Sequence, residues 1–131
     1  DIDSLEDLGT ARNLGPDRTD VLLEEGAVLY DMEATDDARK RFDRIIELDA
    51  RHPAALFFRA LCRAKAGDEP GSLADLDLSI EAVDDADARF NRAVLRIKAG
   101  RKAEAAEDLR KVLELSPEYP RAREILERLP Q

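Results

Sequence analysis

Apolar and small residues recur along this chain at the three- and four-residue spacing of amphipathic helices. In residues 37–48 the positions on this stripe are Ala38, Phe42, Ile45, Ile46 and Leu48. Comparable segments span residues 71–82 and 104–115, and each follows another apolar segment of similar length. The pattern predicts an all-α fold built from pairs of helices.

The helix pairs repeat along the chain. Phe90 stands 33 positions after Phe57, and the surrounding residues match at the same offset. The further matched pairs are Arg59/Arg92, Ala60/Ala93, Arg63/Arg96, Lys65/Lys98 and Gly67/Gly100. A fixed period of this length is the signature of stacked helix–turn–helix units.

Glycine and proline mark the breaks between helices. Gly67 and Gly100 can adopt the left-handed conformation that ends a helix, and Pro53, Pro70, Pro117 and Pro120 suit helix starts or connections. We therefore expect a single domain over residues 1–131. Its parts are a lead-in or extra helix at 1–18, repeats at 19–52, 53–85 and 86–118, and a capping helix within 119–131 with a stripe of Ala122, Ile125, Leu126 and Leu129.

Small residues stand at fixed places in each helix pair. They are Gly26, Ala60 and Ala93 in the first helices and Ala38, Ser72 and Ala105 in the second, each of the latter followed four positions later by Phe42, Leu76 or Leu109. Close helix crossings need such residues, with a bulky partner alongside. With a period of 33 to 34, residues 19–118 resemble the tetratricopeptide repeat family. The resemblance implies an α-α superhelix of three tandem helix–turn–helix repeats with a C-terminal capping helix.

Two aromatic positions of the family are replaced in this chain, and we expect these sites to pack less fully. The replacements are Leu22, Leu56 and Arg89 early in the first helix, and Leu29, Arg63 and Arg96 later in it. Opposite charges also recur 16 residues apart, as Glu25/Arg41, Arg59/Asp75 and Arg92/Asp108. They predict one exposed salt bridge between the helices of each repeat, and such pairs contribute about 0–1 kcal/mol.

The resemblance further implies that the first helices line a concave surface. The residues facing it would be Leu23, Ala27, Tyr30, Phe57, Leu61, Ala64, Phe90, Val94 and Ile97, rimmed by Lys65 and Lys98 and by acidic Asp20, Asp31 and Asp87. We expect a non-catalytic scaffold that binds a protein or peptide with an apolar segment in this groove. The alternatives are that Phe57 and Phe90 are core residues only, that a terminal segment of the chain fills the groove, that the module forms a homodimer, or that it regulates a larger protein.

A subset of the family binds the carboxylate tails of chaperones through Lys, Asn and Arg at set groove positions. In this chain those positions hold Leu23, Ala27, Phe58, Asp87 and Asn91. The resemblance therefore argues against that binding mode here.

Charge narrows the range of partners. The chain carries 21 basic and 30 acidic residues, a net charge of −9, which disfavours nucleic acid and anionic lipid. No stretch has the length needed to span a bilayer, so we expect no membrane insertion. Arginine in excess of lysine, with many Ala and Asp, indicates a bacterial source. A cytoplasmic location is favoured, and a periplasmic one stays open because the chain start is missing or processed.

Candidate catalytic and metal-binding residues are sparse. His52 is the single histidine, and we expect a solvated turn residue rather than a general base. Cys62, the single cysteine, lies in an apolar run and is predicted to be a buried small hydrophobe. Segment 75–79 imitates a calcium loop but is predicted helical, and the acidic clusters near residues 31–37 and 84–87 fit solvated turns and helix starts. We predict no enzymatic activity, no cofactor and no metal.

Overall fold

The computed structural model describes residues 18–130, and within this range the chain is helical with no strand. Seven helices follow one another: α1 (Thr19–Asp31), α2 (Thr35–Leu48), α3 (Pro53–Lys65), α4 (Glu69–Ala82), α5 (Ala86–Lys98), α6 (Lys102–Leu115) and α7 (Ala122–Arg128). The predicted all-α fold is confirmed. The predicted lead-in at 1–18 lies outside the described residues except for Arg18.

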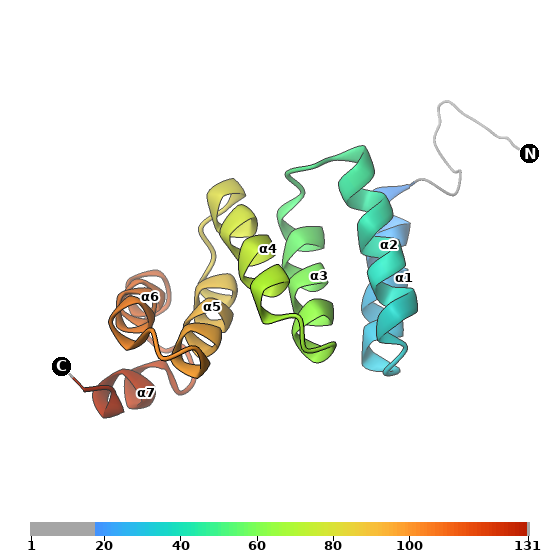
Figure 1. Ribbon diagram of the computed structural model, residues 1–131. Helices are drawn as coiled ribbons and strands as arrows, with labels where there is room; N and C mark the ends of the chain where they lie inside the picture. Colours follow the sequence, from blue (N-terminus) through green and yellow to red (C-terminus); the bar gives the residue numbers. More distant parts are fainter. Residues whose placement is uncertain (1–17, 131) are drawn as a thin grey trace, which may run out of the picture.

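The helices stack as successive antiparallel pairs. The most extensive contacts join α1 to α2, α3 to α4 and α5 to α6, and each pair then packs on the next through α2–α3 and α4–α5. Figure 1 shows the pairs following one another along the stack, with α7 beyond α6 at the C-terminal end. Contacts between α6 and α7 make α7 the predicted cap of the last repeat.

Turn chemistry explains where the helices begin and end. Gly67 and Gly100, each one residue beyond the C-cap residue of α3 or α5, have φ of 85° and 80°, a conformation that favours glycine. Asp68 caps α4, and Asp85 accepts hydrogen bonds from the first amides of α5. His52 is half-buried and its Nδ1 accepts a hydrogen bond from Ala55 N at 3.2 Å. The solvated histidine of the prediction is therefore a helix cap.

The small residues lie where the helices of each pair cross. Gly26, Ala60 and Ala93 are buried, as are Ala38, Ser72 and Ala105 in the partner helices. The closest crossing is in the first repeat, where a Cβ added to Gly26 would lie 2.5 Å from the Phe42 ring. The bulky partners Phe42, Leu76 and Leu109 are fully enclosed beside them, as predicted.

Serine replaces an apolar residue at two buried positions of α4, and both hydroxyls bond back to α3. Ser72 Oγ donates to the carbonyl of Ala60 at 2.8 Å, and Ser79 Oγ donates to the carbonyl of Pro53 at 3.0 Å. A buried hydroxyl without such a partner would be destabilising. The two bonds therefore fix α4 against α3 at both ends of their contact.

Cys62 lies in the core between the first two repeats with Phe42 and Ile45. Its side chain is enclosed, and burial raises the pKa of the thiol to about 11. A thiol of that pKa is protonated and unreactive near neutrality. The prediction of a buried small hydrophobe is confirmed.

The three predicted ion pairs form, but two of them are not exposed. Arg41 Nε lies 3.3 Å from Glu25 Oε1 at the surface. In contrast, Asp75 and Asp108 are almost completely buried, and each receives two hydrogen bonds from one arginine, Arg59 or Arg92, at 2.7 to 3.0 Å. The prediction of exposed pairs is thus wrong for the second and third repeats.

The arginines at the family's aromatic positions explain this burial. Arg63 Nη1 lies 3.2 Å from Asp75, and Arg96 Nη1 lies 2.8 Å from Asp108. Arg89 adds a third guanidinium to Asp108 at 3.1 Å. The expected loose packing is wrong at Leu22 and Leu56, which are buried. It is also wrong at the arginine positions, because the guanidinium groups compensate the charge of a buried carboxylate.

Arg59 and Arg92 also reach back to the preceding repeat. Arg59 Nη1 lies 3.2 Å from Asp43 of α2, and Arg92 Nη1 lies 2.7 Å from Asp77 of α4. Hydrogen bonds, to Asp75 and Asp108 above all, raise the pKa of both arginines above its usual value. Each guanidinium thus connects the second helix of its own repeat to the second helix of the preceding repeat.

Candidate interaction surface

The predicted groove residues come from one side of the three first helices, and the core does not enclose any of them. Lys65, Val94 and Lys98 are exposed, and the other eight are half-buried. On α3, by contrast, Leu56, Ala60 and Cys62 are buried. The first helices therefore carry an apolar side that is left partly open beside the side that packs in the core.

A hollow of about 370 Å³ lies between α1 and α3. Leu23 and Ala27 of the predicted set form its apolar wall together with Val21 and Phe58, and its acidic residues are Asp20 and Glu24. The contact between α1 and α3 brings these two helices together directly.

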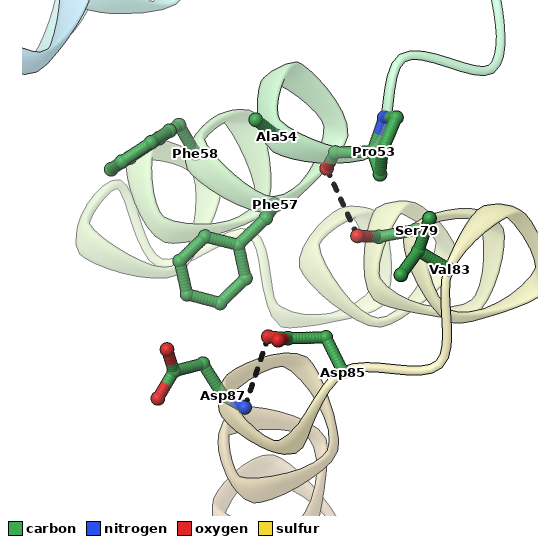
Figure 2. A pocket seen from close by; sticks show the side chains of 8 residues that line it. All are labelled: Pro53, Ala54, Phe57, Phe58, Ser79, Val83, Asp85 and Asp87. Carbon is green, nitrogen blue, oxygen red and sulfur yellow. Dashed lines mark hydrogen bonds between the residues drawn. The ribbon is translucent and has the colours of Figure 1, made fainter.

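A second hollow, of about 330 Å³, lies beside Phe57 where α3 and α4 meet the start of α5. Figure 2 shows the Phe57 ring facing Asp85 and Asp87 across this space, whereas the Phe58 ring points away from these carboxylates. Its lining residues are Pro53, Ala54, Phe57, Phe58, Ser79, Val83, Asp85 and Asp87. Apolar side chains thus form most of the wall, and two carboxylates form one edge.

Phe58 lines both hollows, although it was not among the predicted groove residues. Its ring stacks on Phe42 with centroids 5.3 Å apart and meets the edge of Phe57 at 5.5 Å. Two adjacent aromatics on one helix point about 100° apart and cannot share a face. The pair Phe57-Phe58 was the sequence signal that one of these rings would sit between the core and the surface.

The predicted groove changes character at the third repeat, because the chain covers Phe90 with its own Tyr119. The two ring centroids are 5.0 Å apart, and Tyr119 Oη donates a hydrogen bond to Asp87 Oδ1. Burial, followed by the bond to Asp87, raises the pKa of Tyr119 well above its usual value. Tyr119 lies in the connection between α6 and α7, so the residue that contacts Phe90 comes from this connection and not from a terminal segment.

Charge is distributed unevenly along the first helices. Asp20, Asp85 and Asp87 lie near their starts, whereas Lys65 and Lys98 lie at their ends. Lys65 Nζ bonds to Glu33 at 3.2 Å, which raises the pKa of the lysine, and it lies 4.5 Å from the centre of the Tyr30 ring. Lys98 pairs with Glu69 at 3.5 Å. The more strongly acidic edge is therefore the one beside the two hollows.

The described part of the chain offers no geometry for metal chemistry. Within residues 18–130, no three His, Cys, Asp or Glu side chains come close enough together to hold a metal ion. Segment 75–79 is helical within α4, as predicted, and Asp36 and Asp37 stand in the first turn of α2. Over the same range, no helix has the length and apolar character needed to cross a membrane.

Comparison with solved structures finds helical repeat proteins of the same fold. A MamA structure superposes with a TM-score of 0.79 at 20% identity, covering 85% of this chain and 66% of that one, so the chain spans just under two thirds of its length. The first repeat domain of Spaghetti (RPAP3), bound to an HSP90 peptide, gives 0.79 at 22% identity over 86% of this chain and 90% of that one. The Yersinia enterocolitica secretion chaperone SycD, bound to a peptide of the translocator YopD, gives 0.78 at 20% identity over 88% and 95%.

A sequence search of curated proteins gave no match. Family models do match, and both describe the same repeat. One covers residues 23–85 and the other residues 86–119, which together include both helices of all three pairs for almost their whole length. The recurring small residues and the period inferred from the sequence thus agree with the models and with the superposed structures, and the chain belongs to the tetratricopeptide repeat family.

Proposed function

We propose that this chain is a non-catalytic protein-interaction scaffold that binds an amphipathic helix or an extended apolar peptide across α1, α3 and α5. The observation that carries the proposal is the pair of hollows on either side of Phe58, whose walls are apolar and whose acidic residues lie at one edge. Aromatic side chains, Phe among them, are enriched in protein interfaces relative to the rest of the surface.

The charge of the surface indicates what the bound segment would carry. Asp20 and Glu24 lie beside the first hollow, and Asp85 and Asp87 lie beside the second. Basic residues next to the apolar anchors would complement these carboxylates and speed association. The net charge of −9 favours the same class of partner and disfavours nucleic acid.

Energetics permit such binding. Each Å² of apolar surface removed from water contributes about 25 cal/mol, although ordering and association costs offset much of the gain. Val94 and Ile97 on α5 would extend the contact beyond the two hollows. The structures of SycD and of Spaghetti (RPAP3) support the proposal because in each of them the same fold is bound to a peptide.

The test is to select peptides from a random display library on the chain and to measure their affinity by fluorescence anisotropy. Ala54→Arg places a long cationic side chain in the second hollow, and Ala103→Arg makes the same change at an exposed site on α6. We expect selected peptides rich in apolar and basic residues, with at least tenfold weaker binding to Ala54→Arg and unchanged binding to Ala103→Arg. Equal affinities for the two variants, with equal helical content by circular dichroism, would contradict the groove.

A homodimerisation module and a regulatory domain of a larger protein are the competing predictions. Light scattering over a wide concentration range separates the first from a peptide-binding monomer. A dimer whose formation is blocked by Ala54→Arg would show that a second copy, rather than a foreign peptide, occupies these hollows.

A further inference from the structure

Helix α1 leaves open a face that the other first helices bury. Its Val21 and Val28 are 39% and 53% exposed. The equivalent residues are Ala55 and Cys62 on α3 and Ala88 and Leu95 on α5, all of them buried. The reason is that α3 and α5 pack against the second helix of the preceding repeat, α2 or α4, whereas residues 18–130 contain no such helix before α1.

A hollow adjoins this face. It has a volume of about 410 Å³ and is lined by Val28 and Leu29 with Glu24, Glu25 and Arg41. In the later repeats a helix of 14 residues, α2 or α4, fills the equivalent place. Four residues connect α2 to α3, and three connect α4 to α5. A suitable occupant would therefore carry the second-helix pattern and end shortly before Thr19.

Residues 1–14 carry that pattern. The sequence Ser4-Leu-Glu-Asp-Leu8 matches Ser72-Leu-Ala-Asp-Leu76 at four of five positions and resembles Ala105-Ala-Glu-Asp-Leu109. At a shift of 34 positions, Ser4, Leu8 and Ala11 correspond to three residues of α2 that are fully buried, namely Ala38, Phe42 and Ile45. Four residues separate Leu14 from Thr19, as four separate Leu48 from Pro53.

We propose that residues 1–14 form the second helix of a further repeat and dock on the Val21 and Val28 face of α1. The sequence match and the exposed face are independent of each other and agree in register. A short connection also gives this segment a high effective concentration at the face, which a separate molecule lacks. The proposal does not depend on the peptide-binding groove.

Charges at the contact are consistent with this register. Arg59 and Arg92 reach back from a first helix to Asp43 and Asp77 of the preceding second helix. In α1 the equivalent position holds Glu25, and the position that would face it holds Gly9 instead of an aspartate. Like charges are thereby avoided where the ion pair is missing.

The experiment measures the accessibility of a thiol placed on the face. Val28→Cys introduces the residue that α3 carries at this position, and the native Cys62 is enclosed and gives little background. In the full chain we expect alkylation of the new thiol to be at least tenfold slower than that of a reference thiol from Leu115→Cys, at a site 44% exposed. Adding Leu8→Asp should remove this protection.

A matched control separates docking from a general effect of charge. Asn13 corresponds to Glu47, Glu81 and Glu114, which are all exposed, so Asn13→Asp should leave the thiol protected. Alkylation that is equally fast with and without Leu8→Asp would overturn the proposal. So would protection that appears only as protein concentration rises, because a second copy would then cover the face. Unchanged circular dichroism of the three repeats is required in every variant.

Discussion

The first and third repeats join their two helices in different ways at the same place. In the first repeat, Gly26 lets the Phe42 ring approach the backbone of α1, and the ion pair of Glu25 and Arg41 stays at the surface. In the third repeat, Asp108 is buried between α5 and α6 and bound by three arginines. One junction is apolar and tightly spaced, and the other is ionic.

The difference follows from residues that are not themselves at the crossing. Leu22 and Leu29 occupy the family's aromatic positions in the first repeat, whereas Arg89 and Arg96 occupy them in the third. A carboxylate can be buried only where its charge is compensated, and leucines cannot do that. The same helical hairpin therefore tolerates a buried anion when arginine replaces leucine at the later of these positions, as Arg63 does for Asp75 in the second repeat.

The largest effect is expected from Asp108→Ala. This change leaves Arg89, Arg92 and Arg96 partly buried without their shared carboxylate, and breaking a buried ion pair from one side costs about 3–5 kcal/mol. Urea unfolding followed by circular dichroism should show a loss of that size at neutral pH. Its counterpart, Glu25→Ala in the first repeat, should cost at most about 1 kcal/mol because that pair is exposed. Similar losses of unfolding free energy in the two variants would contradict the distinction between a buried ionic junction and an exposed ion pair.

The next largest effect is expected from Gly26→Ala. Its new Cβ would meet the Phe42 ring at 2.5 Å, and overpacking of this kind typically costs about 1–3 kcal/mol. Adding Phe42→Leu should recover part of the loss, since it reproduces the Ala and Leu combination of the later repeats. A double-mutant cycle on the free energy of unfolding measures this coupling. Additive losses would show that the ring and the glycine are not matched to each other.

The smallest effect concerns pH and the connection between the second and third repeats. The hydrogen bond from Arg89 lowers the pKa of Asp84. The resulting stability is present above the ordinary Asp value of about 3.9 and is lost as pH falls through the lower value of the folded state. Asp84→Asn should therefore lower stability by about 0.5 kcal/mol or less at pH 7, given the partial exposure of this pair. The deficit should vanish toward pH 2, and a deficit that grows on acidification would contradict the assignment.

Sequence periodicity predicted the helices, the repeat units and the small residues at the crossings, because each depends on local spacing. It also predicted which charges pair. It could not predict how deeply Asp75 and Asp108 lie, since their burial depends on Arg63 and Arg96 acting from another turn of the partner helix. The spacing of two paired charges does not reveal that further arginines bind the same carboxylate.

The candidate surface was predicted in outline only. Leu23, Ala27 and Phe57 do line hollows, but Phe58, which connects these hollows, was not among the apolar residues predicted to face the groove. The contact of Tyr119 with Phe90 was also missed, because it comes from an irregular connection whose path no periodicity encodes. A residue outside the regular helices thus limits the exposed part of the candidate surface at the third repeat.

Arg59 and Arg92 have a consequence for how the molecule unfolds. Each bonds at once to its own repeat and to the preceding one, so it acts as a nearest-neighbour coupling in a one-dimensional array. Such couplings discourage partly melted states in which one hairpin opens alone. Amide hydrogen exchange across α3 to α6 should then follow a single cooperative opening, with the amides of α1 exchanging ahead of it.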